Sequence, residues 1–231
     1  MKIDLYGDGI GSVDYVSHMG SDLTVVNSAR VSFGVEKQQL EEKDKKLISY
    51  LLKHKHTSTL EHNLVTFRFT VPLFIRSQHH RHRTWSYNEI SRRYTEVGMR
   101  FYEPKQFRTQ HNSNRQASNI DELSDPLIDS SGLAGGNHAS YLVLTHHKTC
   151  MRLYEKLLAS GVCREQARGV LPQNMYTEYY GTVNLNNLLK FVDLRSHEGA
   201  QWEIQRVADA CLDIAKQLYP VTVSAYVESR T

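Results

Sequence analysis

A stretch of strict alternation, VTFRFTV at residues 65–71, constrains the fold of this chain more than any other segment. Apolar side chains occupy the odd positions from Val65 to Val71, and Thr or Arg occupies the even ones. Because successive side chains of a strand point to opposite faces, the pattern predicts a strand buried on one face only. Such half-buried strands are typical of antiparallel sheets. Pro72 ends the strand, since proline has no N–H to donate to a sheet.

Amphipathic helices are predicted on both sides of this strand. Apolar residues recur at helical spacing in four segments: 41–54, 138–160, 186–194 and 200–218. Ser21 stands where an N-cap would begin a short helix, and residues 73–83 predict another after Pro72.

Two further strands are predicted at residues 2–6 and 176–183. The stretch 103–137 is rich in polar residues and has no clear period, so we expect a long surface loop there. The fold class that follows is α+β: one antiparallel sheet with several helices. Since no break in composition divides the chain, we expect one domain over residues 1–231.

Composition narrows the possible functions. The net charge of +3 suits an anionic small molecule but is too small to indicate a nucleic-acid partner. The N-terminus lacks the apolar core of a signal peptide, and no apolar run is long enough to span a membrane. The three cysteines are widely spaced and form no zinc or disulfide pattern, which favours a reducing, cytoplasmic location.

The stretch RHRTWSYNEISRRY, residues 81–94, contains four arginines and no lysine. An arginine presents a planar fork of donors that matches phosphate, and Ser86, Asn88 and Ser91 add further polar groups. A basic surface element is the alternative, but this interleaving favours an anion site. Glu89 is then a salt-bridge partner or an acceptor for a ligand hydroxyl, such as that of a ribose.

Histidines cluster in two places, HKHTSTLEH at 54–62 and QHHRH at 78–82. A metal site is disfavoured because neighbouring arginines repel a cation and His-x-His pairs diverge on a helix. We therefore expect no metal. Hydrogen-bonded histidines, or neutral contacts to an aromatic cofactor with Ser58 donating nearby, are the remaining interpretations.

Two arginines outside the motif are also candidates for anion binding. Glu165 and Arg168 are three residues apart, so they form an intrahelical ion pair, unless Arg168 is a second anion clamp. Arg195 follows an apolar stretch and needs an anionic partner, which Glu198, Glu203 or a ligand can supply.

The arrangement Arg-His-Arg, seven residues, then Ser resembles the signature of the flavin-dependent thymidylate synthases. Here it comprises Arg81, His82, Arg83 and Ser91. The segments HKHTSTLEH, REQARGVLP, TVN and DLRSHEGAQWEIQ are similar to the same family in order and spacing. The resemblance covers almost the whole chain. Lys190 stands where relatives often have Asn or His, and Gly199 where relatives can have His.

This resemblance implies a single catalytic domain in a homotetramer, with FAD bound between subunits and each active site shared among several chains. The implied reaction is the reductive methylation of dUMP to dTMP. The one-carbon unit comes from 5,10-methylenetetrahydrofolate, and NADPH reduces the flavin. No activated cysteine is needed, and Arg195 is the implied catalytic residue because it favours the ionised uracil N3.

The resemblance also assigns contacts residue by residue, and neighbouring subunits share them. The implied FAD contacts are His56, Ser58, Arg81, His82, Arg83, Glu89, Asn184, Asn186 and Lys190. The implied dUMP contacts are Gln78, His79, His80, Arg81, Glu89, Ile90, Ser91, Arg92, Arg93, Arg168 and Arg195.

Two other classes of function compete with this one. A nucleic-acid-binding module would use residues 76–94, but the low net charge, the lack of an aromatic platform motif and the carboxylate of Glu89 disfavour it. A flavoprotein oxidoreductase without methyl transfer would oxidise NADPH regardless of dUMP. We expect neither a nucleic-acid partner nor a membrane partner.

Overall fold

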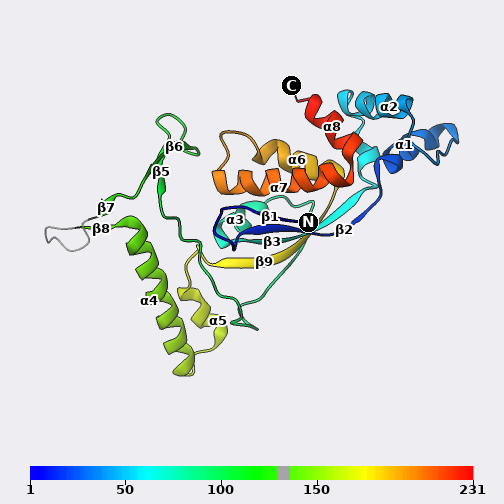
Figure 1. Ribbon diagram of the computed structural model, residues 1–231. Helices are drawn as coiled ribbons and strands as arrows, with labels where there is room; N and C mark the ends of the chain where they lie inside the picture. Colours follow the sequence, from blue (N-terminus) through cyan, green and yellow to red (C-terminus); the bar gives the residue numbers. More distant parts are fainter. Residues whose placement is uncertain (129–135, 231) are drawn as a thin grey trace.

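The computed structural model describes residues 1–128 and 136–230, and its centre is a five-stranded sheet (Figure 1). The strands lie in the order β1-β2-β3-β9-β4, and every neighbouring pair is antiparallel. Their bounds are β1 Lys2–Asp4, β2 Ser12–Met19, β3 Leu64–Pro72, β9 Tyr176–Asn184 and β4 Ser86–Glu89. The α+β class with an antiparallel sheet is therefore confirmed.

Strand β3 behaves as its alternation predicts. Val65, Phe67, Phe69 and Val71 are all buried, whereas Arg68 on the opposite face is exposed. The central position of β3, paired on both sides, explains why its apolar face is so completely covered. Its neighbour β9 must have a glycine at 181, because a Cβ there would lie 2.8 Å from the ring of Phe69.

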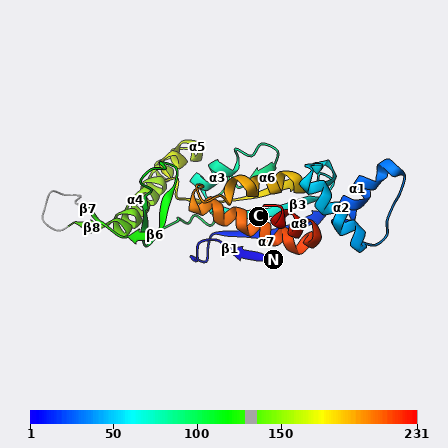
Figure 2. The ribbon, with the colours of Figure 1, turned by 90° about the horizontal axis from the view of Figure 1, so that it is seen from above.

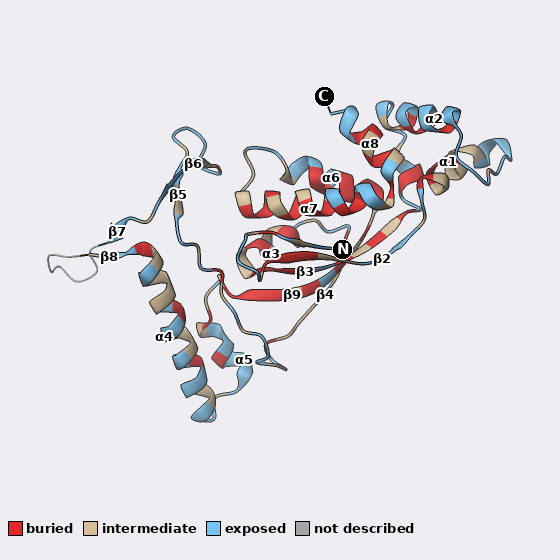
Figure 3. Cartoon of the chain, in the orientation of Figure 1, coloured by how far each residue is buried: buried red, intermediate tan, exposed pale blue. Residues whose placement is uncertain are grey.

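Three helices cover one face of the sheet: α3 (Leu73–His79), α6 (Leu185–Arg195) and α7 (Trp202–Leu218). Figure 3 shows the buried sides of α6 and α7 turned toward the sheet. The predicted stripe of α7 is confirmed, since Ile204, Val207, Cys211 and Ile214 are all fully buried. The opposite face of the sheet is open, and Tyr180 on it is 47% exposed.

The remaining helices gather at the two ends of the molecule (Figures 1 and 2). One end contains α1 (Asp22–Arg30), α2 (Glu42–Lys53) and α8 (Pro220–Glu228). The buried carboxylate of Asp22 accepts hydrogen bonds from the backbone N–H groups of Val221 and Thr222, at 3.0 and 2.8 Å, and so joins α1 to α8. The other end contains α4 (Ala139–Ala159) and the short α5 (Arg164–Ala167). Over the described ranges, no helix has the length and apolar character needed to cross a membrane.

Two predicted segments differ from the structure. The helix predicted at 73–83 ends at His79, because the chain turns there to enter β4, which pairs with β9. The predicted loop 103–137 is partly wrong: it contains four short strands, while residues 129–135 lie outside the described residues. The strands are β5 Phe107–Gln110, β6 Ser118–Ser124, β7 Leu127–Ile128 and β8 Asn137–His138. Such short strands have too little hydrophobic periodicity to be predicted from the sequence.

Candidate active site

Helix α6 has expected site residues at both of its ends. Asn184 is its N-cap, and its Oδ1 accepts a hydrogen bond of 2.9 Å from the backbone N–H of Asn187. A helix rises 1.5 Å per residue, so Asn186 and Arg195 stand about 14 Å apart along the axis. The candidate residues consequently form two groups, one at each end of α6.

The C-terminal end of α6 places Arg195 against the arginine motif. Its Nε donates a hydrogen bond of 3.0 Å to Nε2 of His82. This requires an unprotonated His82 Nε2, and burial together with the charge of Arg195 lowers the pKa of His82 to about 4. Burial also lowers the pKa of Arg195, and the charge of Arg81 adds to that effect.

Several guanidinium groups at the C-terminal end of α6 have N–H donors without a protein acceptor in the described part of the chain. Among the described residues, none forms a side-chain hydrogen bond or ion pair with Arg81 or Arg83, and Arg195 uses only its Nε. Since Arg81 and Arg195 repel each other, an anion bound between them would lower the electrostatic energy. We call Arg81, His82 and Arg195 the arginine group.

Glu89 lies at the end of β4 and is held from two sides. Its Oε1 accepts a hydrogen bond of 2.7 Å from the Thr177 hydroxyl and lies 3.2 Å from Nε of Arg76. The neighbouring Ile90 is fixed by its backbone, which donates to the carbonyl of Glu178 at 2.9 Å. Glu89 is thus oriented by groups on α3 and β9 before any ligand is bound.

The last residues of the motif divide between the interior and the surface. Ser91 Oγ accepts a hydrogen bond from the backbone N–H of Arg93 at 3.3 Å. Arg93 is exposed, and its guanidinium stands 5.3 Å from the ring of Tyr94. Arg92 is buried and donates to the carbonyl of Val97 at 2.7 Å, and burial lowers its pKa. Arg93 therefore faces outward next to the half-buried Ser91, whereas Arg92 supports the turn from within.

His79 and His80 lie behind the arginine group. His79 is fully buried, shares a 2.8 Å hydrogen bond between its Nδ1 and the Tyr179 hydroxyl, and has a pKa well below the usual value because of burial. His80 stacks on Tyr87, with ring centroids 4.1 Å apart. In this arrangement both side chains anchor the end of α3, and the His79 side chain has no surface to offer a substrate.

The N-terminal end of α6 forms the second group. Asn186 Nδ2 donates a hydrogen bond of 2.7 Å to Oε1 of Glu61, which follows the short helix η2 (Thr57–Leu60). His56 is the N-cap of η2, and both His56 and Ser58 are exposed. Polar groups from η2 and α6 thus lie side by side at this end.

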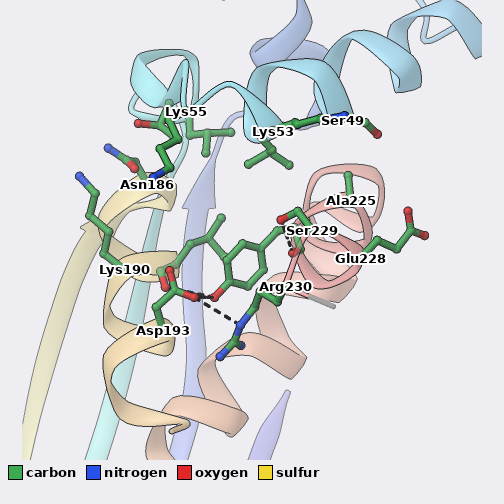
Figure 4. Close-up of a pocket in the computed structure, with 15 residues that line it drawn as sticks. Ser49, Lys53, Lys55, Asn186, Lys190, Asp193, Ala225, Glu228, Ser229 and Arg230 are labelled. Atoms are coloured by element: carbon green, nitrogen blue, oxygen red, sulfur yellow. Dashed lines mark hydrogen bonds and ion pairs between the residues drawn. The ribbon is translucent and has the colours of Figure 1, made fainter.

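A cavity of about 710 Å³ opens next to this second group, between α2, η2, α6 and α8. Figure 4 shows Asn186 and Lys190 on its α6 side, with Lys55 next to Asn186. Lys53 lies at its α2 side, and Arg230 follows the end of α8. Its floor includes apolar side chains of all four elements, so the cavity combines apolar walls with a mainly basic rim. A flat ligand with anionic substituents suits such a lining.

Comparison with known proteins identifies the family to which these residues belong. The thymidylate synthase complementing protein family matches residues 14–221, a range that contains both groups of candidate residues. The chain belongs to this family. Among curated relatives, the flavin-dependent thymidylate synthase of Thermus thermophilus is 41% identical over 218 residues, which are 94% of this chain and 76% of the relative. That of Thermotoga neapolitana is 38% identical over 228 residues, covering 99% of this chain and 95% of the relative.

A solved structure agrees with this assignment. The crystal structure of the UMP/dUMP methylase PolB from Streptomyces cacaoi, bound with 5-Br dUMP, superposes with a TM-score of 0.80 at 33% identity. The match covers 98% of this chain and 97% of PolB. The family resemblance inferred from the motifs, and the assignment to an enzyme family, are thus confirmed.

The residues that the family resemblance assigns to one active site do not all lie together in a single chain. Gln78, Arg81, His82 and Arg195 come together, and Asn186 and Lys190 come together at the other end of α6. Arg168 is exposed on the helix η3 (Arg168–Val170), and within the described part of the chain no ion pair joins it to Glu165. Nor do the described residues contain a group of three or more His, Cys, Asp or Glu placed to hold a metal ion.

Three residues of the site were not singled out from the sequence, namely Arg76, Thr177 and Gln201, and Glu61 was noted only as part of the histidine cluster at 54–62. Each contacts an expected site residue, namely Glu89, Glu89, Gln78 and Asn186 respectively. Arg76 could have been singled out as the one charge in the apolar run after Pro72. Thr177 and Gln201 have no local signal, because their partners are distant in the sequence.

Proposed function

We propose that this chain catalyses the FAD-dependent reductive methylation of dUMP to dTMP. 5,10-Methylenetetrahydrofolate would be the one-carbon donor and NADPH the reductant. The observation that carries the proposal is the arginine group: a half-buried, neutral His82 and two close guanidinium groups with unused donors, in a member of a thymidylate synthase family.

The nucleotide would bind along the arginine motif. Ser91 and Arg93 would hold the phosphate, since a hydroxyl and an exposed guanidinium lie together on one turn. Glu89 is already oriented by Arg76 and Thr177 and would accept from a sugar hydroxyl. Arg168 would complete the phosphate contacts from a neighbouring subunit.

Arg195 would activate the base. Its Nε is committed to His82, which leaves the terminal nitrogens of the guanidinium to stabilise negative charge on the uracil N3 and its flanking oxygens. A more electron-rich ring is more nucleophilic at C5. The partial burial of Arg195 strengthens this effect, because charges interact more strongly away from water.

The residues present fit a flavin dinucleotide. Unused donors of Arg81 and Arg83 match a pyrophosphate, and the cavity beside Asn186 and Lys190 has apolar walls that suit a ring system. His56, Ser58 and Asn184 would add polar contacts at the same end of α6. Bound FAD would supply the hydride that the one-carbon transfer requires.

We further propose that the single domain works as a homotetramer with shared sites. The two groups at the ends of α6 and the distant, exposed Arg168 would meet only across subunits. Helix α4 supports association, because its Tyr141 and Leu153 are 55% and 46% exposed. Light scattering at working concentration tests this, and a monomer would refute it.

The direct test is the visible spectrum of the purified protein, followed anaerobically after NADPH is added, with and without dUMP. We expect a bound flavin that bleaches at a rate that responds to dUMP. A protein that stays colourless after reconstitution with FAD contradicts the proposal. Bleaching that ignores dUMP, with no dTMP formed, would indicate a flavoprotein oxidoreductase instead.

A second candidate substrate follows from the structural match to PolB, which is described as a UMP/dUMP methylase. UMP differs from dUMP by one ribose hydroxyl, and Glu89 could accept from it. Parallel assays of dTMP formation from dUMP and of 5-methyl-UMP formation from UMP decide the point. Turnover of dUMP alone would exclude UMP.

A further inference from the structure

One residue that lines the cavity between α2, η2, α6 and α8 has a backbone conformation that favours glycine. Lys55 has a φ of 58°, and in the described part of the chain no other residue except glycine has a positive φ. It comes directly after His54, the C-cap of α2. The backbone N–H groups of Lys55 and His56 donate to the carbonyls of Leu52 and Leu51, at 3.0 and 2.8 Å. Helices with this pair of bonds end in a left-handed residue, which is most often glycine.

Glycine would fit position 55 without strain, because the strain comes from the Cβ of a larger residue. The end of the helix uses only backbone atoms of residue 55, so the lysine side chain is not needed there. What this side chain adds is an amine at the cavity, where Figure 4 shows it next to Asn186. Residues with strained backbones cluster at active sites and ligand clamps, so Lys55 is a candidate for interaction with a ligand.

Lys55 and Lys190 make the cavity basic. Four cationic and two anionic side chains line it, so its lining has a net charge of 4 − 2 = +2. Asp193, one of the two carboxylates, lies 3.4 Å from Nε of Arg230. Within the described ranges neither Lys55 nor Lys190 forms an ion pair. These two amines are therefore free to stabilise a negative charge inside the cavity.

We propose that Lys55 and Lys190 raise the reduction potential of the flavin, by stabilising the negative charge that its ring acquires on reduction. This inference rests on the proposed function, in which the ring system of FAD lies in this cavity and NADPH reduces it. A hydride carries one proton and two electrons. Its transfer breaks a C–H bond of NADPH, leaves NADP⁺ and gives the neutral flavin one negative charge. Ammonium groups near the ring favour this charged form over the uncharged, oxidised one.

The effect requires that the charges lie near the ring, and it does not depend on one particular contact. The energy of two charges falls only with the inverse of their distance, and physiological salt screens it over about 8 Å. A ring that fills the cavity lies within this range of the lysines that line it. The apolar walls of Leu52, Leu60 and Leu189 exclude water and so strengthen the interaction. Glu61, whose carboxylate accepts from Asn186, acts in the opposite direction but does not line the cavity.

The experiment is equilibrium reduction of the FAD-loaded protein against a redox dye of known potential, without oxygen. The wild type is compared with Lys55→Gly and Lys190→Met, each of which removes one positive charge. At a fixed ratio of reduced to oxidised dye, each variant should have a ratio of reduced to oxidised flavin about tenfold lower. For a two-electron couple this is a fall in potential of about 30 mV.

Lys55→Gly has a second readout that moves in the opposite direction. Glycine removes the strain of the left-handed backbone, so the flavin-free variant should melt a few degrees above the wild type. A lysine with only a structural role would alter the melting temperature without altering the potential. Lys55→Arg keeps both the charge and the strain, so its potential should stay close to the wild-type value.

Lys43→Met is the matched control for lost charge. Lys43 is an exposed residue of α2 that does not line the cavity, and its Nζ lies 2.9 Å from a carboxylate oxygen of Glu41. The potential of this variant should be unchanged, because the lost charge is in water and is paired.

An unchanged potential in Lys55→Gly and Lys190→Met, with FAD still bound, overturns the inference and leaves the proposed function intact. So does a fall of the same size in Lys43→Met, which would attribute the effect to net charge rather than to the cavity. Weaker FAD binding at an unchanged potential also overturns it, since the lysines would then hold the phosphates of FAD in both redox states. A wild-type protein that cannot be loaded with FAD overturns the proposed function and this inference together.

Discussion

Replacing Arg195 by methionine should raise the pKa of His82. Two causes lower that pKa from its ordinary 6.5 to about 4: burial, which is the larger, and the charge of Arg195. Methionine has a side chain of similar length but no charge. His82 therefore stays buried while the neighbouring positive charge is lost. Because the charge accounts for less than half of the decrease, the rise should be about one pH unit, and the pKa should stay below 6.5.

The measurement is an NMR titration of protein labelled at its histidines and stripped of flavin. His82→Gln assigns the resonance by its disappearance. Arg195→Lys is the matched control, because it keeps the positive charge but not the planar fork, and His82 should then titrate close to its wild-type value. The same Arg195→Met protein should retain FAD yet form no dTMP, since the group that we propose to activate the base is missing.

Three results would contradict these expectations. An unchanged or lower His82 pKa in Arg195→Met would mean that the guanidinium charge does not reach the imidazole. An equal rise in the lysine and methionine variants would attribute the effect to packing rather than charge. Near-normal turnover of Arg195→Met would remove its role as activator.

The remaining predictions concern the phosphate contact, a buried carboxylate and the effect of pH on folding. Ser91→Ala should weaken dUMP binding about tenfold and FAD binding less, by equilibrium titration, and equal losses would reassign the residue. Asp44 is fully buried and 2.6 Å from Arg30, so Asp44→Asn should lower the free energy of unfolding by about 3 kcal/mol, and a urea-denaturation loss below about 1 kcal/mol would contradict this. The folded-state pKa values of His79 and His82 lie below the ordinary 6.5. The unfolded chain therefore takes up protons first, and the melting temperature should fall as the pH drops from 6.5 toward 4. A flat profile over that range would show that these histidines do not control acid stability.

Periodic segments of the chain could be predicted because they depend on local geometry. The alternation from Val65 to Val71 and the stripe from Ile204 to Ile214 each place apolar groups on one face, and the structure buries those faces. Strand β4 could not be predicted, because it lies within the arginine motif, whose polar residues were interpreted as an anion site. Strand β2 has only a weak alternation, since its second half is exposed.

The candidate site residues can be separated in the same way. Some belong to a contiguous motif and could be predicted, whereas the surroundings of others depend on tertiary contacts. Spacing alone singled out Arg81, His82, Arg83 and Ser91, because the motif is contiguous. It could not distinguish the buried Arg92 from the exposed Arg93, which are neighbours with the same charge. Nor could it show that His79 lies in the core, since burial depends on residues brought from β9 and α6.

The sequence by itself determined the family, the class of fold and the chemistry of the anion motif, since these depend on residue types at short, regular spacings. Only the tertiary structure decided which of those residues meet. Arg195 and His82 are 113 positions apart, and the 3.0 Å bond between them requires an unprotonated Nε2 of His82. Glu203 reaches Gln78 only through Gln201, after α7 has packed beside α3. Hydrogen bonds and charges act over a few ångströms in space, and a linear sequence does not record those distances.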